Sequence, residues 1–468
     1  MRKLFFLFLL VATLLPTYAV RSFTLNLTPD GAAQLFAFLP DNPSGRAVVV
    51  LPGGGYSHLS MNNEGVDWAP FFNSKGIACF VLKYRMPKGD LSIPVGDAEH
   101  AMRMVRDSAQ QWRINPYDVG IMGSSAGGHL ASTLATHAQF EARPDFQILF
   151  YPVISMNERE THRGSVEGFL GTHKSDPEMV KLYSNDQQVR RHLTPPAIIL
   201  MAHNDPVVPP ITNGIAYYSA MQRQGVPCAL HIYPGGWHGF GFNSSYSYHE
   251  QMLADISSWL DKLPSHKPEQ IRVACIGNSI TDGFGIYMPE DNGYPAQLQK
   301  MLGEKFYVRN YGVSARTMNW QGRFPYMNEQ AWRDALAFRP NIVIVKLGTN
   351  DANLVNWTKD HRVIKDQLEH DYQQMIDSLT ALPTKPQIYL TFPIKIWNNS
   401  FGLNDSLLTT DIIPCIKKIA KKNKLPIIDM YKPFSENTDK SLYLSDGVHP
   451  NEKGCRKMAE LVYDALKK

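Results

Sequence analysis

Short apolar runs alternate with longer amphipathic stretches along most of this chain, in two successive series. The apolar runs are rich in valine, isoleucine and leucine, which favours buried strands, and the stretches between them favour helices. Such an alternation predicts mostly parallel sheets that are covered by helices on both faces. We therefore predict an α/β chain with two three-layer α/β/α domains.

The two series meet at a short polar segment with two prolines, LPSHKPEQ (263–270). Prolines in polar company mark turns and linkers, so the domain boundary is placed there. We predict a first domain over 20–264, a linker over 265–270 and a second domain over 271–468. The first series predicts strands at AVVVLP, IACFVLKY, VGIMG, QILFYPV, AIILMA and CALHIYP, and helices near 97–112, from 126, near 211–224 and up to 263. The second predicts strands at RVACIGN, FYVRNYG, NIVIVKLG, QIYLTFP and PIIDMY, and helices near 294–302, 329–338, 362–382 and 407–422 and from 451.

The first residues have the build of a secretory signal peptide. Arg2 and Lys3 precede an apolar run over 4–15, and a proline and small residues follow it up to Val20. The run is shorter than the ~20 apolar residues that a membrane-spanning helix needs. We expect removal of 1–19, no membrane association after that step, and a periplasmic or secreted protein; an uncleaved anchor is the alternative.

Composition and net charge limit the classes of binding partner and cofactor that are expected. A chain of 468 residues with 44% apolar content is ordinary for soluble globular domains, and a net charge of +4 does not predict nucleic-acid binding. The five cysteines are odd in number and widely spaced, which favours small buried side chains over a disulfide framework or a metal site. No cofactor and no metal is expected.

A candidate nucleophile follows the run VGIMG, where GSSAGG places Ser125 between a strand and a helix. Flanking glycines suit the strained backbone of such a sharp turn. An earlier strand ends in GGGY, where glycines let backbone N–H groups approach an acyl oxygen closely. We predict that Gly54, Gly55 and Ala126 form an oxyanion hole, in which each donor lowers the barrier by about 3 to 4 kcal/mol. A tight loop without a chemical role is the alternative for the glycines.

Two further residues complete a serine-hydrolase order around Ser125. Asp205 follows AIILMA and His238 follows CALHIYP, which gives the order Ser, acid, His. We predict that His238 takes the proton of Ser125 and passes it to the leaving alcohol, while Asp205 fixes the tautomer of His238. The competing candidates, for which a structural role is favoured, are His203, His129 and Asp97.

The segment 46–263 resembles the α/β-hydrolase superfamily, most closely secreted esterases of the acetylxylan-esterase-like group. The oxyanion loop reads PGGGY where lipase-like relatives have HGGG. Pro52 therefore replaces a histidine that helps to hold the loop in those relatives. The fold is implied more strongly than the substrate.

The second series contains four polar blocks. They are GNSIT (277–281), NYGVSA (310–315), GTND (348–351) and DGVHP (446–450). Together they resemble the SGNH family of GDSL-type esterases, whose fold is flavodoxin-like, over essentially the whole second domain. The resemblance implies that Ser279 is the nucleophile, that Asp446 orients the base His449, and that Gly312 and Asn350 donate to the oxyanion.

Two details of these blocks have a physical reading. The D-x-x-H spacing lets the acid reach the imidazole within one loop. A polar turn after a buried strand is the alternative reading for Asn350 and Asp351. Asn278 stands where the family name implies an aspartate, outside the proton-transfer chain.

Both resemblances imply a bifunctional serine esterase that removes O-acetyl groups from carbohydrates such as xylan or pectin. The alternatives are a sialate O-acetylesterase, a feruloyl-type esterase or a peptidase in the first domain, or one domain that serves only as a carbohydrate-binding module. Acetylated carbohydrate is the expected partner. The aromatic residues that either stack on sugar rings or pack in loops are Tyr56, Trp237, Trp320, Trp357 and Trp397.

Overall fold

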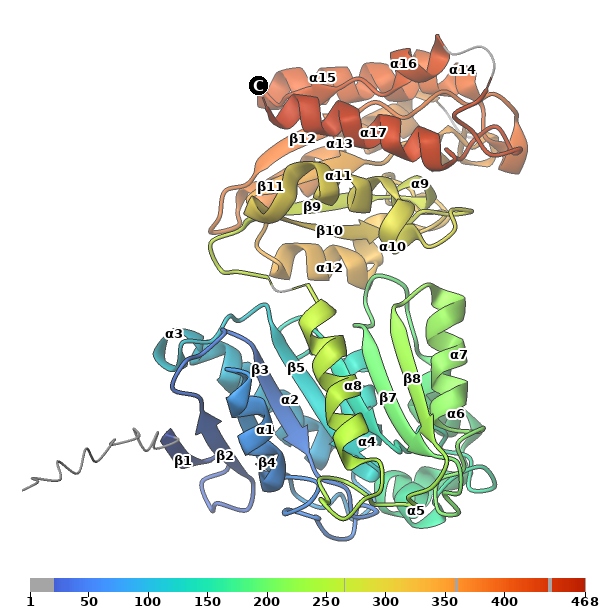
Figure 1. Ribbon diagram of the computed structural model, residues 1–468. Helices are drawn as coiled ribbons and strands as arrows, with labels where there is room; N and C mark the ends of the chain where they lie inside the picture. Colours follow the sequence, from blue (N-terminus) through green and yellow to red (C-terminus); the bar gives the residue numbers. More distant parts are fainter. Residues whose placement is uncertain (1–20, 265, 358–360, 437–439, 468) are drawn as a thin grey trace, which may run out of the picture.

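Two open sheets, one after the other along the chain, organise this protein (Figure 1). The computed structural model describes residues 21–264, 266–357, 361–436 and 440–467. The predicted signal peptide at 1–19 lies outside these residues. Helices cover both faces of each sheet, which confirms the predicted pair of α/β domains.

The first sheet has eight strands in the order β1-β2-β4-β3-β5-β6-β7-β8. β1 and β2 are antiparallel to their neighbours, and the strands from β4 to β8 are parallel. The hairpin of β1 and β2 is absent from the sequence prediction. β2 alternates half-buried and buried residues, so it has no long apolar run that would reveal it. The strands are β1 (Arg21–Asn26), β2 (Gln34–Leu39), β3 (Ala47–Leu51), β4 (Ala78–Lys83), β5 (Val119–Ser124), β6 (Gln147–Phe150), β7 (Ala197–Ala202) and β8 (Cys228–Tyr233).

The helices of the first domain lie on two faces of its sheet. α1 and α8 pack on one face, and α2, α4 and α7 pack on the other. The predicted helix at 97–112 is two helices, because the chain breaks at Ser108. The helices are α1 (Ala69–Ser74), α2 (Ser92–Asp107), α3 (Ala109–Trp112), α4 (Ala126–His137), α5 (Arg163–Leu170), α6 (Pro177–Tyr183), α7 (Gly214–Gln224) and α8 (His249–Lys262).

The second sheet has five parallel strands in the order β10-β9-β11-β12-β13. α12, α13 and α15 cover one face, and α11 and α17 cover the other. The strands are β9 (Ile271–Gly277), β10 (Phe306–Gly312), β11 (Ile342–Lys346), β12 (Gln387–Thr391) and β13 (Ile427–Ile428). The helices are α9 (Ser279–Asp282), α10 (Pro289–Asn292), α11 (Tyr294–Leu302), α12 (Gln330–Ala337), α13 (His361–Thr380), α14 (Asp405–Leu407), α15 (Ile413–Asn423), α16 (Tyr431–Ser435) and α17 (Glu452–Leu466).

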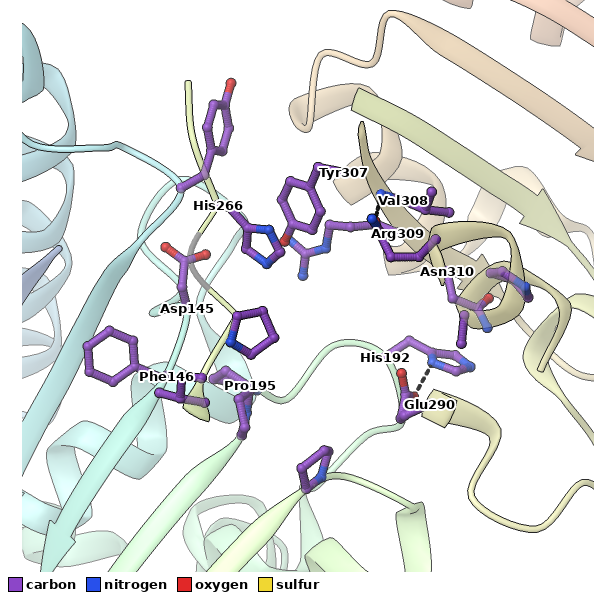
Figure 2. Close-up of a pocket in the computed structure, with 18 of the residues that line it drawn as sticks. Asp145, Phe146, His192, Pro195, His266, Glu290, Tyr307, Val308, Arg309 and Asn310 are labelled. Atoms are coloured by element: carbon purple, nitrogen blue, oxygen red, sulfur yellow. Dashed lines mark hydrogen bonds and ion pairs between the residues drawn. The ribbon is translucent and has the colours of Figure 1, made fainter. Parts of the chain in front are cut away.

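The second domain packs on the amino ends of the first sheet. The segments that precede β5, β6, β7 and β8 line a cavity of about 900 Å³ between the domains, together with edge strand β10 (Figure 2). Arg143 forms a buried ion pair with Asp334 of α12, and the His266 ring stacks on Tyr307 at 3.5 Å. Because residues that follow the strands lie at the opposite ends of the first sheet, Ser125 lies away from this contact.

Candidate active sites

A hydrogen-bonded chain of three side chains forms at the carboxyl ends of the first sheet. His238 Nε2 lies 2.8 Å from Ser125 Oγ, and His238 Nδ1 lies 2.7 Å from Asp205 Oδ2. The other oxygen of Asp205 accepts hydrogen bonds from the backbone N–H groups of Val207 and Val208, both at 2.9 Å. These bonds fix the carboxylate, which in turn fixes the imidazole with Nε2 facing the serine.

The backbone of Ser125 has the strained geometry expected of a nucleophile on a sharp turn. Its φ is +52° and its ψ is −119°, between the end of β5 and the start of α4. A Cβ at Gly123 or Gly127 would overlap neighbouring backbone, so the close packing of this turn needs glycine at both positions. The first N–H groups of a helix have no intrahelical acceptor, and the N–H of Ala126 is one of them. The start of α4 thus suits the predicted role of the Ala126 N–H as an oxyanion donor.

A buried glutamate that the sequence reading missed holds the oxyanion loop. Glu64 Oε2 accepts from the Gly53 N–H at 2.9 Å, and Glu64 Oε1 accepts from the Tyr151 hydroxyl at 2.6 Å. The Tyr151 oxygen accepts from the N–H of Gly241, which lies in the same loop as His238, between β8 and α8. This network joins the oxyanion loop to the histidine loop.

The three competing residues of the first domain have structural contacts. Asp97 pairs with Arg85 at 2.7 Å, and the backbone N–H of the exposed His203 donates to the carbonyl of β8. His129 is fully buried and bonds to the Tyr56 hydroxyl at 2.8 Å. Burial lowers the pKa of His129 to about 4 and outweighs the hydrogen bond to the Tyr183 carbonyl. All three are therefore separate from the chain that ends at Ser125.

A second chain of three side chains forms in the other domain. His449 Nε2 lies 2.8 Å from Ser279 Oγ, and His449 Nδ1 lies 2.7 Å from Asp446 Oδ2. Asp446 Oδ1 accepts from the backbone N–H groups of Val448 and His449. Burial raises the pKa of Asp446, but these hydrogen bonds and the nearby imidazole outweigh it and lower that pKa overall. Asp446 is thus held as a carboxylate against the imidazole.

The predicted oxyanion donors of the second site have protein acceptors. The Gly312 N–H donates to Asn310 Oδ1 at 2.8 Å, and Asn350 Nδ2 donates to the Arg316 carbonyl at 2.9 Å. Asn310 Nδ2 in turn donates to the carbonyl of Thr281 at 2.7 Å. An oxyanion would share or replace the acceptor of Gly312. Sequence reasoning did not reveal this acceptor, since Asn310 lies inside the β10 strand.

Lys346 is a fully buried cation-forming group behind the second site. Its amine lies 2.9 Å from the Thr349 hydroxyl and 3.4 Å from Asn278 Oδ1, and Asn278 caps α9 by accepting from the Ile280 N–H. Burial lowers the pKa of Lys346 to about 7. Burial and the charge of Lys346 lower the pKa of His449, while Asp446 opposes them.

The five aromatic candidates divide by exposure. Tyr56 is buried between Tyr84 and Phe169, so it packs in the loop and does not face a sugar. Trp237, next to His238, is 64% exposed, and Trp320 is 46% exposed. Trp397 is half-buried beneath the Lys395 and Lys440 amines. The side chain of Trp357 lies outside the described residues.

Comparison with known proteins agrees with both halves of this picture. Residues 48–242 match the alpha/beta hydrolase fold family, and residues 275–457 match the GDSL-like Lipase/Acylhydrolase family. These matches confirm the predicted resemblance of each domain. Within the part of the chain that the structure describes, no helix is both long and apolar enough to cross a membrane.

Three similar proteins cover different shares of the chain. The acetylxylan esterase of Xylanibacter ruminicola is 50% identical over 485 residues, with all of both chains covered. Endo-1,4-beta-xylanase B of Butyrivibrio fibrisolvens is 34% identical over 225 residues, which are 44% of this chain and 34% of that protein. A solved structure, the acetyl ester-xyloside bifunctional hydrolase of Caldicellulosiruptor lactoaceticus, is 33% identical at a TM-score of 0.46 and covers 49% of this chain and 87% of its own.

Proposed function

This chain belongs to the acetylxylan esterase family, and on that premise we propose that it removes acetyl groups from a xylan-type polysaccharide at two separate serines. It is a carboxylic ester hydrolase with two hydrolase domains. One observation carries the proposal for two sites. In both domains a histidine lies 2.8 Å from the serine and 2.7 Å from an aspartate.

The first site supports an acyl-enzyme mechanism. Ser125 Oγ attacks the acetyl carbonyl while His238 Nε2 takes its proton, and the imidazolium is stabilised by Asp205. Backbone N–H groups of the glycine loop and Ala126 would hold the oxyanion. His238 then gives that proton to the ester oxygen of the sugar, whose bond to the acyl carbon breaks, and the sugar leaves as the free hydroxyl. Water, deprotonated by the same imidazole, releases acetate from Ser125.

The second site supports the same sequence of steps with its own groups. Ser279 would form the acetyl-enzyme, and His449 would move the proton between the serine and the leaving sugar oxygen. Asp446 accepts from His449 Nδ1 and from two backbone N–H groups, so the imidazole keeps its tautomer through both steps. The amide of Asn350 donates without competing for the proton, as an oxyanion donor must.

The separation of the two sites supports independent catalysis. Ser125 lies at the carboxyl ends of the first sheet, while the second domain packs on the amino ends (Figure 1). The side chains that surround the serines also differ, with Trp237 beside the first histidine and Phe284 4.5 Å from the second. Two serines with different neighbouring side chains suit a polymer that bears acetyl groups at different ring positions. The N-terminal segment supports export to the place where such polymers are found.

Paired serine variants test this function. Ser125→Ala, Ser279→Ala and the double variant are compared with the parent chain for acetate release from acetylated xylan. We expect each single variant to keep part of the activity. NMR of the remaining polysaccharide should show that the two single variants leave acetyl groups at different positions. The double variant should lose all enzymatic release of acetate. If one single variant loses all activity on acetylated xylan, pectin and sialosides, the proposal of two working sites is wrong. Release of ferulate or of peptides in place of acetate would favour a feruloyl-type esterase or a peptidase in the first domain.

A further inference from the structure

A histidine of the first domain reaches the helix that carries the second serine. His192 lies in the turn before β7, at the amino end of the first sheet, and has a φ of +62°. Its ring points across the domain contact toward Glu290 of α10 (Figure 2). The side chain is 3% exposed although the turn that carries it lies at the surface of its own domain. The second domain therefore covers this ring.

Both ring nitrogens of His192 face oxygen atoms of the second domain. Nε2 lies 2.9 Å from the carbonyl oxygen of Asp282 and 3.0 Å from its Oδ1, and Nδ1 lies 2.6 Å from Glu290 Oε1. A carbonyl only accepts, so Nε2 donates to Asp282, whereas Nδ1 makes no hydrogen bond and pairs with Glu290 through charge when the ring is protonated. Burial lowers the pKa of His192, but Glu290 and Asp282 outweigh it and raise the pKa to about 9. Arg191 is the other charged group that acts on these carboxylates.

Asp282 links this histidine to the second active site. It is the last residue of α9, the one-turn helix that begins with Ser279. Its carboxylate accepts a hydrogen bond from the Ser314 hydroxyl, two residues after Gly312. The backbone of Asp282 packs so closely on Gly312 that a Cβ at that position would overlap it. Asp282 therefore connects the nucleophile's helix with the loop of a predicted oxyanion donor.

We propose that His192 is a positioning residue for the second active site, which holds Asp282 and thereby the spacing between Ser279 and Gly312. The proposal rests on the proposed esterase function of Ser279. His192 touches no reacting atom in this account and acts only through Asp282. The contact makes the first domain part of the framework of the second site, which is a physical reason for the two to share one chain.

The test uses the full chain with one serine removed at a time. In the Ser125→Ala background only the second site is active. His192→Gln in this background should lower kcat about tenfold or more, because a hydrogen bond to a charged group is lost. KM should change less, because the sugar-binding surface is untouched. His192→Lys keeps a cation beside Asp282 and should recover part of kcat. In the Ser279→Ala background, His192→Gln should leave the first site at its parent rate.

Two further measurements separate positioning from loss of folding. His100→Gln, an exposed histidine on α2, is the matched control and should leave both sites unchanged. The parent second site should lose kcat reversibly as the pH rises through about 9, where His192 loses its proton, and His192→Gln should lack that loss. Glu290→Gln, which weakens the same cation without altering α9, should lower second-site kcat in the same direction.

The outcomes distinguish this proposal from the function on which it rests. A His192→Gln variant with parent kcat at the second site overturns the positioning role and leaves the esterase function intact. Equal loss at both sites also overturns it, because the residue would then support the whole chain. The Ser125→Ala variant is also compared with the double variant that carries Ser279→Ala as well. If the two release acetate at the same rate, the second site is not an esterase and the proposal fails with that function.

Discussion

Replacing Glu64 with glutamine tests whether the first oxyanion loop is held from behind. Glu64→Gln keeps the shape of the side chain but exchanges one oxygen for an NH2 group. Both oxygens accept, one from the Gly53 N–H at 2.9 Å and one from the Tyr151 hydroxyl at 2.6 Å. A glutamine can accept only one of them, and its NH2 group then faces the other partner.

The expected fall in kcat at the first site follows from that single lost hydrogen-bond acceptor. A hydrogen bond to a charged group contributes about 1.5 to 3 kcal/mol, and each 1.4 kcal/mol of transition-state stabilisation is about tenfold in rate. We expect kcat at the first site to fall about 10- to 100-fold, because a loop that moves no longer aims its N–H groups at the oxyanion. KM should change little, since Glu64 lies behind the loop and away from the sugar.

The assay is the hydrolysis of 4-nitrophenyl acetate by the Ser279→Ala variant, in which only the first site reports. Glu178→Gln is the matched control, because Glu178 is exposed on α6 and its side chain forms no hydrogen bond or ion pair with the described residues. A first-site kcat for Glu64→Gln within twofold of the control would refute the reasoning. A fall in KM with unchanged kcat would refute it equally.

Three more predictions follow from buried charges. In a pH profile, kcat/KM at the second site should fall on acidification with a midpoint below 6.5. The reason is that burial and Lys346 lower the pKa of His449 more than Asp446 raises it. A midpoint at or above 6.5 would contradict this. The thermal stability of Lys346→Met relative to the parent should increase as the pH falls from 10 to 7. In that window the unfolded parent chain, with a lysine pKa of about 10.4, binds more protons than the folded one, so the parent alone loses stability; a constant difference in melting temperature would contradict this. Arg143→Ala should destabilise the chain by about 3 to 5 kcal/mol in urea unfolding, because it leaves Asp334 charged and buried without its partner, and the removal of both charges should restore part of the loss.

The parts of this molecule that sequence reading found are those with local signatures. Ser125 is recognisable because its strained turn needs glycines within two residues, and Asp446 and His449 because they share one short loop. Buried parallel strands are apolar throughout, so their runs were evident. Asp205 and His238 were predicted from their order after strands, and the structure places these distant residues 2.7 Å apart.

The parts that were missed depend on contacts between distant segments. Glu64 and Tyr151 are 87 positions apart, and His192 and Asp282 are 90 apart. Neither pair has a local pattern, because each residue alone reads as an ordinary polar position. The hairpin of β1 and β2 was missed for another reason, since β1 is mostly exposed and β2 alternates half-buried and buried residues, so neither has a long apolar run. Long-range polar contacts are thus where the structure adds most to the sequence.

The claim that two serines form acyl-enzymes on one chain is tested most directly by active-site labelling. The intact chain is treated with a fluorophosphonate, which reacts with activated serines, and its mass is measured before and after proteolytic mapping. We predict two adducts per chain, one on Ser125 and one on Ser279, each lost in the corresponding serine-to-alanine variant. A single adduct at saturation, or an adduct on any other serine, would contradict the account.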